Sequence, residues 1–211
     1  MVKFQKKAII FDLDGVICFT DKFHYQAWKA LADRLGIYFD KEINDRLRGV
    51  SRMASLEIIL EQSGREYTRE EKETFASWKN GTYQKLLKSM SPMDLSGEVK
   101  DTLVSLRNRG YKLAIGSSSR NTKLILGQIG LGNFFDAVAD GTDITRSKPD
   151  PEVFLLAAQK LGFVPADCAV VEDAKAGIEA AMTALALFGD AKGCGLEDYD
   201  LACFSNLLDI F

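Results

Sequence analysis

Apolar residues follow two different patterns along the chain. Near the N-terminus the run Lys7-Ala8-Ile9-Ile10-Phe11 is almost continuously apolar and stops at Asp12, which predicts a strand covered on both faces. From residue 98 onward, amphipathic stretches alternate with short apolar runs. This alternation of helix and strand predicts an α/β fold with a doubly wound, parallel (Rossmann-like) sheet and right-handed crossovers.

The spacing of apolar residues and the positions of glycines set the expected elements of this alternating part. We expect strands at 111–116, 137–139, 169–171 and 185–188, and helices through 99–106, 124–129, 154–161 and 178–182. Together with the strand at 7–11 they would form one core.

Residues 20–90 carry helical patterns only. The expected helices run from 24 to 35 before Gly36, from the N-cap Asp40 to Leu47 with Gly49 as its stop, from the N-cap Ser51 to Leu60, and from the capping box of Thr68 and Glu71 to Leu87. This block separates the first strand from the alternating part. We therefore predict a helical cap domain at 19–90, inserted into an α/β core domain made of 1–18 and 91–211.

Composition narrows the class of protein. The 211 residues are 46% hydrophobic and 27% charged with a net charge of −3, which suits a globular chain and provides no basic face for nucleic acid or anionic lipid. No apolar run is long enough for a membrane span or the core of a signal peptide. The four cysteines (18, 168, 194 and 203) lack metal-site or disulfide spacing. We expect a cytoplasmic monomer with reduced thiols and no nucleic-acid or membrane partner.

Polar side chains follow four of the predicted strands. They are Asp12 and Asp14 after the first strand, Ser117 to Asn121 after the second, Lys148 in the loop after the third, and Glu172 with Asp173 after the fourth. Each group alone has an ordinary explanation as a turn, a helix cap or a loop. Because ligands bind at the carboxyl edge of such sheets, their convergence there favours an active site.

These residue types suit phosphoryl transfer. Asp12, Glu172 and Asp173 offer the hard oxygen ligands that hold Mg²⁺ beside a phosphate, and Asp12 can itself attack phosphorus. Asp14, two residues further on, is a candidate general acid and base.

Basic and hydroxyl groups complete this chemistry. Lys148 and Ser117 would neutralise and hydrogen-bond the phosphoryl oxygens. Arg52 stands at a predicted helix start, where free N–H groups favour an anion, and Arg120 offers similar chemistry at another helix start. Two anion sites would suit a bisphosphate intermediate, but the residues by themselves favour an ordinary Ser51 cap with a solvated arginine.

The ordered motifs Asp12-Leu13-Asp14-Gly15-Val16, Ser117, Lys148-Pro149 and Glu172-Asp173 resemble the haloacid dehalogenase superfamily of phosphotransferases over nearly the whole chain up to Gly189. The resemblance implies that Asp12 is the nucleophile and that Asp14 is the acid/base, which also binds Mg²⁺ through its backbone carbonyl. The implied catalytic residues are Asp12, Asp14, Ser117 and Lys148; the implied Mg²⁺ ligands are Asp12, Asp14, Glu172 and Asp173; the implied substrate-binding residues are His24, Gly49, Val50, Ser51, Arg52, Ser55, Lys79, Ser118, Ser119, Arg120 and Asn121.

Within this superfamily the chain is most similar to sugar phosphomutases. The resemblance implies Mg²⁺-dependent interconversion of β-glucose 1-phosphate and glucose 6-phosphate through an aspartyl-phosphate enzyme and a bisphosphate. A sugar-phosphate phosphatase on the same scaffold is the alternative. A structural role in a partly buried position and a role in the site are equally open for His24. For Trp28, on the same helix face, a packing role is favoured.

Overall fold

The computed structural model describes residues 6–47, 51–184 and 203–211. The chain divides into two compact units, which we call the core unit (Met1–Phe19 with Ser91–Phe211) and the cap unit (Thr20–Met90). The first boundary between the units follows Phe19, one residue later than the boundary that the sequence pattern predicts. The strand expected at 185–188 lies outside the described residues.

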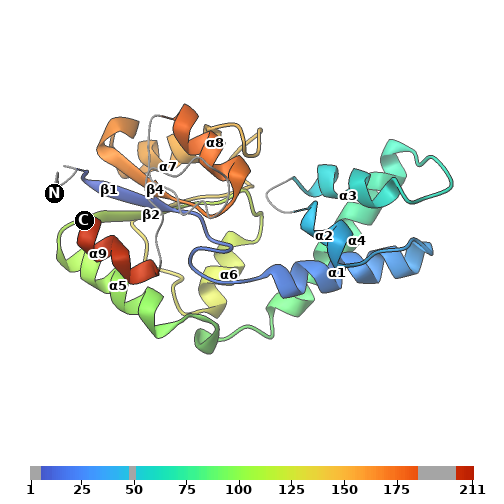
Figure 1. Cartoon of the computed structure of the whole chain (residues 1–211), viewed down its shortest axis with the longest axis horizontal. Coiled ribbons are helices and arrows are strands. Elements are labelled where there is room, and N and C mark those ends of the chain that lie inside the picture. The colour runs from blue at the N-terminus through green and yellow to red at the C-terminus, as the bar shows by residue number, and fades with distance from the viewer. Residues whose placement is uncertain (1–5, 48–50, 185–202) are drawn as a thin grey trace. The chain divides into compact units, whose positions relative to one another are not determined.

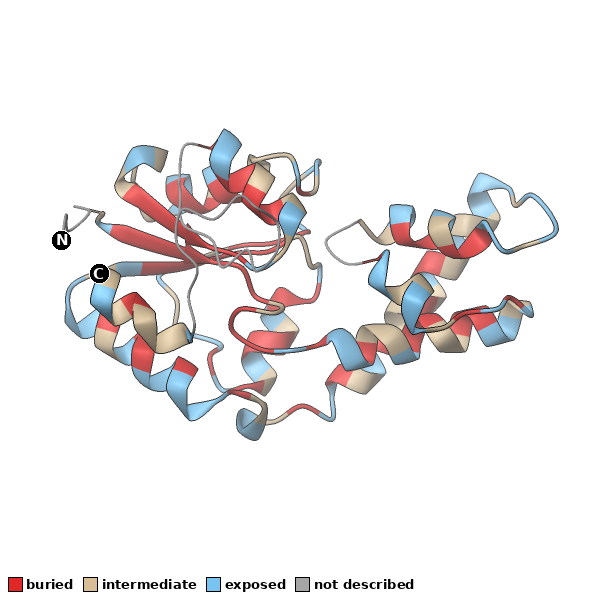
Figure 2. Ribbon diagram, viewed as in Figure 1, coloured by how far each residue is buried: buried red, intermediate tan, exposed pale blue. Residues whose placement is uncertain are grey.

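Among the described residues, four parallel strands form the sheet of the core unit (Figure 1). They are β1 (Ala8–Phe11), β2 (Lys112–Gly116), β3 (Ala137–Ala139) and β4 (Cys168–Val171), in the order β3-β2-β1-β4. Every residue of β1 and β4 is buried, as Figure 2 shows, because helices cover both faces. The predicted parallel α/β fold is confirmed.

The helices of the core unit lie on two faces of the sheet (Figure 1). They are α5 (Gly97–Asn108), α6 (Thr122–Gln128), α7 (Glu152–Leu161), α8 (Lys175–Thr183) and α9 (Leu207–Ile210), with 3₁₀ turns η1 (Pro92–Asp94), η2 (Pro165–Asp167) and η3 (Phe204–Asn206). Phe154 of α7 packs against Ile10 of β1 in the core on one face, and Phe204 of η3 lies 5.8 Å from Phe11, ring centroid to ring centroid. The 3₁₀ turns and α9 have no counterpart in the sequence prediction.

Strand order places a topological switch between β1 and β4. The chain winds outward from β1 to β2 to β3 and then crosses back to β4 on the other side of β1. Phe11 is level with Ile115 on one side and with Val171 on the other. The residues that follow these strands therefore leave the sheet at one edge, where ligands of such folds bind.

The cap unit consists of α1 (Asp21–Leu35), α2 (Lys41–Asp45), α3 (Arg52–Leu60) and α4 (Arg69–Leu87). Its own core contains Trp28 and Leu31 of α1 with Leu56 and Ile59 of α3 and Ala76 of α4. Each of these helices thus buries an apolar stripe within the unit, apart from α2, which is short and has no fully buried residue.

The predicted N-caps of the cap unit are confirmed. Asp40 accepts a hydrogen bond from the backbone N–H of Ile43, Ser51 accepts one from Ala54, and Thr68 forms a capping box with Glu71. The predicted end of α2 at Leu47 is wrong. The amides of Arg46 and Leu47 bond three residues back, so the helix tightens into a turn after Asp45, and Gly49 lies outside the described residues.

None of the described helices is long and apolar enough to cross a membrane. Among the described cysteines, Cys18, Cys168 and Cys203 are free thiols, and Cys194 lies outside the described residues. Burial, reinforced by the carboxylate of Asp14, raises the pKa of the Cys18 thiol, so it stays protonated.

Gly116 at the end of β2 offers a test of this packing. A Cβ there would lie 2.7 Å from the ring of Phe154 and 3.0 Å from Ile10. We expect Gly116→Ala to destabilise the protein by about 1–3 kcal/mol, measured by urea unfolding, because both neighbours are buried and must move. The control is Gly127→Ala in α6, where a Cβ meets nothing within 4 Å and should leave stability unchanged or up to about 1 kcal/mol higher. Equal midpoints for the two variants would contradict the prediction.

Candidate active site

Asp12 begins the loop that follows β1. Its amide donates to the carbonyl of Val171 at 2.9 Å, which continues the β1–β4 ladder by one residue and sets Asp12 beside Glu172. Further along the loop, Gly15 adopts φ +94°, and a Cβ there would lie 2.2 Å from a carboxylate oxygen of Asp173. Glycine is therefore required for the loop to approach Asp173.

Three carboxylates gather at this edge of the sheet. One oxygen from each of Asp12, Glu172 and Asp173 lies within 4.8 Å of the others, and Asp173 is the exposed member. Hard oxygen donors of this kind bind Mg²⁺ or Ca²⁺, so the set fits a divalent cation. In the described part of the chain, the carboxylate of Asp14 is not a member of this group.

Lys148 connects two of these carboxylates. Its Nζ donates to Oδ1 of Asp12 at 2.5 Å and to Oε2 of Glu172 at 2.6 Å, and the three side chains are at most 10% exposed. Burial alone would lower the pKa of Lys148, but the two carboxylates outweigh it and the pKa is raised. Lys148 is therefore a permanent ammonium.

Glu172 is held from two sides. Its Oε1 accepts from the backbone N–H groups of Asp173 (3.2 Å) and Ala174 (3.0 Å) at the start of α8, while Oε2 accepts from Lys148. Burial and the charge of Asp12 raise its pKa to about 7, although Lys148 and the Ala174 amide oppose that rise. Three carboxylates against one ammonium leave an excess of negative charge, which a divalent cation would offset.

Gly177 makes room for this arrangement. A Cβ at this position in α8 would lie 2.1 Å from the carboxyl group of Glu172. Sequence reasoning did not select Gly177. The available signal was a glycine inside a helical pattern, which costs helix stability and therefore needs a packing reason.

Ser117 starts the loop after β2 and is buried. Its amide donates to the carbonyl of Ala139 at 3.1 Å, and its Oγ accepts from the amide of Ser119 at 3.2 Å. The Oγ of Ser119 in turn accepts from the amide of Asn121, also at 3.2 Å. Ser118 Oγ accepts from the amide of Lys148 at 3.4 Å, which joins this loop to the loop that carries the lysine.

Gly141, after β3, holds the same loop from its other side. Its amide donates to the carbonyl of Ser119 and its carbonyl accepts from Nε of Arg120, both at 3.0 Å. A Cβ would lie 2.3 Å from the carbonyl oxygen of Ser118. Sequence reasoning missed Gly141, although Asp-Gly directly after a strand marks a tight turn.

The predicted site residues of the cap unit form their own contacts. Nζ of Lys79 lies 2.9 Å from Nδ1 of His24, and a guanidinium nitrogen of Arg52 donates to Oδ1 of Asn80 at 2.9 Å. Ser51 caps α3 and Ser55 is buried one turn later, whereas Gly49 and Val50 lie outside the described residues. Asn80 is a partner of Arg52 that the sequence analysis did not select.

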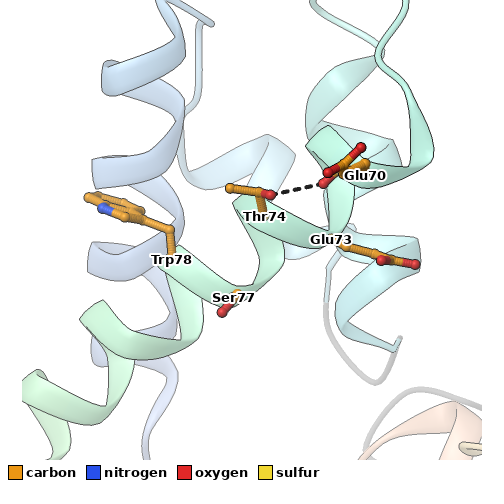
Figure 3. A pocket seen from close by; sticks show the side chains of 5 residues that line it. All are labelled: Glu70, Glu73, Thr74, Ser77 and Trp78. Atoms are coloured by element: carbon orange, nitrogen blue, oxygen red, sulfur yellow. Dashed lines mark hydrogen bonds between the residues drawn. The ribbon is translucent and has the colours of Figure 1, made fainter.

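A shallow depression on α4 is lined by Glu70, Glu73, Thr74, Ser77 and Trp78 (Figure 3). The hydroxyl of Thr74 donates to the backbone carbonyl of Glu70 at 2.9 Å, an ordinary bond within a helix. None of the predicted site residues lines this depression, and we assign no function to it.

The model of the haloacid dehalogenase-like hydrolase family matches residues 6–184. The chain belongs to this family. The match covers all the strand-end residues described above, so the family resemblance of the sequence is confirmed.

Individual relatives show which members of the family the chain resembles. The chain is 45% identical over 180 residues to a β-phosphoglucomutase of Bacillus subtilis, covering 84% of this chain and 80% of the relative. It is 34% identical to the fructose-1-phosphate phosphatase YqaB of Escherichia coli, over 84% of this chain and 92% of the relative. The crystal structure of a β-phosphoglucomutase from Clostridium difficile superposes with a TM-score of 0.88 at 34% identity, covering 96% of this chain and 93% of that one.

The contact between Gly177 and Glu172 leads to a prediction about cation binding. We expect Gly177→Ala to weaken divalent-cation binding at least about tenfold, measured by isothermal titration calorimetry with Mg²⁺, because the added methyl group would displace one of the three carboxylates that fit a cation. Gly97→Ala at the start of α5, where a Cβ meets nothing within 4 Å, is the matched control. Unchanged affinity in Gly177→Ala would remove Glu172 from the ligand set.

Proposed function

We propose that the protein is a Mg²⁺-dependent phosphomutase that interconverts β-glucose 1-phosphate and glucose 6-phosphate through a glucose bisphosphate. The observation that carries this proposal is the cluster of Asp12, Glu172 and Asp173 with Lys148 bonded between two of its members. The 45% identity to the B. subtilis β-phosphoglucomutase supports the choice of substrate.

The carboxylates of Asp12, Glu172 and Asp173, with the backbone carbonyl of Asp14, would hold the Mg²⁺. The bound cation supplies positive charge beside the phosphoryl oxygens.

Asp12 is the proposed nucleophile. In the bisphosphate, its carboxylate attacks the phosphorus of one phosphate, the bond from that phosphorus to the sugar oxygen breaks, and a proton from Asp14 goes to the departing sugar oxygen. The products of this step are a sugar monophosphate and an aspartyl phosphate. In the second step the free hydroxyl of the other sugar monophosphate gives its proton to Asp14 and attacks this phosphorus, the bond to Asp12 breaks, and the bisphosphate forms again. A buried ammonium at Lys148 and the hydroxyl of Ser117 suit the charge that develops on the phosphoryl oxygens, since the water-poor surroundings strengthen each contact.

A phosphomutase must also hold the phosphate that is not being transferred. Arg52, positioned by Asn80, is the proposed clamp from the cap unit, with His24, Lys79, Ser51 and Ser55 as further substrate-binding residues and with Gly49 and Val50 proposed from the sequence alone. Ser118, Ser119, Arg120 and Asn121 are the proposed contributors from the core unit. The alternative function is hydrolysis of a sugar phosphate, which the similarity to the E. coli fructose-1-phosphate phosphatase supports. A monomeric state and a cytoplasmic location remain predictions.

A product assay distinguishes the two functions. With Mg²⁺, β-glucose 1-phosphate and a trace of the bisphosphate, we expect glucose 6-phosphate to form without a matching amount of free phosphate. Asp12→Asn should form neither product, because an amide is a poor nucleophile and removes one charge from the metal ligands. Stoichiometric release of phosphate by the wild type would establish the phosphatase instead.

Arg52 provides a second distinction. We expect Arg52→Ala to lower mutase kcat/KM by about 10²-fold or more, since a charged hydrogen-bonding pair lost from a desolvated site is worth about 2–5 kcal/mol. Hydrolysis of acetyl phosphate, which has no second phosphate, should change little. Arg52→Lys should recover only part of the activity, because a lysine ammonium cannot donate the two parallel hydrogen bonds that a guanidinium gives to a phosphate.

Arg46→Ala is the control for this substitution. Arg46 pairs with Glu61 at 2.7 Å on the exposed surface of the cap unit, where such a pair contributes little. An equal loss in both reactions for Arg52→Ala, or no loss in either, would leave the phosphatase as the better hypothesis.

A further inference from the structure

Lys79 is a buried lysine surrounded by aromatic rings of the cap unit. Its side chain is on α4 and the residue is 2% exposed. The ammonium lies 4.4 Å from the ring centroid of Trp28 and 4.8 Å from that of Tyr83. Both ring faces carry partial negative charge, so they stabilise the ammonium where water is scarce.

The same ammonium determines which nitrogen of His24 carries the proton. Nζ of Lys79 lies 2.9 Å from Nδ1 of His24, and a lysine ammonium has only donors to offer. Nδ1 must therefore accept, which requires a neutral ring with its proton on Nε2.

The imidazole ring is also held in orientation. It stacks on Tyr83, with ring centroids 4.0 Å apart and planes at 33°. The hydroxyl of Tyr83 is itself 2.8 Å from Oγ1 of Thr20. A 180° flip of the ring would keep its plane against Tyr83 but would put Cδ2 in the place of Nδ1, and so would break the bond to Lys79.

Two positive charges of the cap unit oppose protonation of His24: Lys79 from α4 and Arg52 from α3. The phenol ring of Tyr83 also faces the imidazole. Burial first, and then these two positive charges, lower the pKa of His24 well below its ordinary value. The ring therefore stays neutral across the physiological range.

We propose that the ammonium of Lys79 fixes His24 as the neutral tautomer with its proton on Nε2. Trp28, on whose face that ammonium lies, is then a positioning residue of the cap unit and has more than a packing role. His24 would present an N–H donor suited to an acceptor oxygen of a phosphate or a sugar hydroxyl. This last step rests on the proposed function, whereas the tautomer does not.

The chain contains one histidine, so nitrogen NMR of the ¹⁵N-histidine-labelled, ligand-free protein reports on His24 without ambiguity. We expect the Nε2–H tautomer from about pH 5.5 to 8. Lys79→Met, which removes the donor and keeps the stem, should raise the protonated fraction at low pH at least about tenfold. An Nδ1–H tautomer, ordinary titration in the wild type, or an unchanged spectrum in Lys79→Met would overturn the proposal.

Trp28 is tested by a graded pair of variants. Trp28→Leu should shift the His24 signals in the same direction as Lys79→Met, and Trp28→Phe, which keeps a ring face, should restore most of the wild-type spectrum. The matched control is Trp78→Leu on α4, since the ring of Trp78 carries Arg34 at 5.0 Å and not Lys79. An unchanged spectrum in Trp28→Leu, or an equal shift in Trp78→Leu, would reject the role of Trp28.

Activity assays separate this proposal from the proposed function. Trp28→Leu should lower kcat/KM for β-glucose 1-phosphate at least about tenfold, and Trp28→Phe should recover most of it. Circular dichroism checks that each variant is folded. If the wild type proves to be a phosphatase while the NMR results hold, only the assigned reaction fails; if the NMR results fail in an active mutase, only the tautomer proposal fails.

Discussion

The ammonium of Lys148 between Asp12 and Glu172 is the interaction on which the core unit depends. The carboxylates of Asp12 and Glu172 both lie next to one buried ammonium, so they are close to each other and poorly hydrated. Without the ammonium they would repel each other, and each loses hydration on burial. A buried ammonium bonded to both offsets that repulsion, and removing one partner of such a group typically costs about 3–5 kcal/mol. The three groups come from the loops after three different strands, so their contact also ties those loops together.

Backbone approach is the second constraint on this site. Gly15, Gly141 and Gly177 each stand where a Cβ would lie within 2.3 Å of an atom of Asp173, Ser118 or Glu172. Because these glycines have no side chain, the loops and α8 that carry them can pack directly against Asp173, Ser118 and Glu172. The glycines therefore act by leaving space, which an inventory of chemically active residues overlooks.

The cap unit arranges charge by a different route. Arg52 is oriented by the amide of Asn80, and Lys79 lies on the faces of aromatic rings in the packing between α1 and α4. Both arrangements fix the position of a cation within the cap unit. Such preorganisation suits recognition of a phosphate group, because the protein then reorganises little on binding.

Local signals along the sequence were sufficient for the four described strands, for the N-caps Asp40, Ser51 and Thr68, and for the strand-end residues Asp12 and Glu172. Each of these depends on neighbours a few residues away. The doubly wound rule then placed those strand ends at one edge of the sheet. The tertiary structure alone decided that Lys148 bonds to Asp12, 136 residues away, and that Lys79 meets His24, 55 residues away. Such pairs depend on side-chain reach and on packing between elements distant in the sequence, which no local period encodes. At Gly141 and Gly177 the sequence offered only indirect signals, a turn dipeptide and a glycine in a helical pattern. What each glycine approaches could not be predicted, since a close approach exists only once both surfaces are in place.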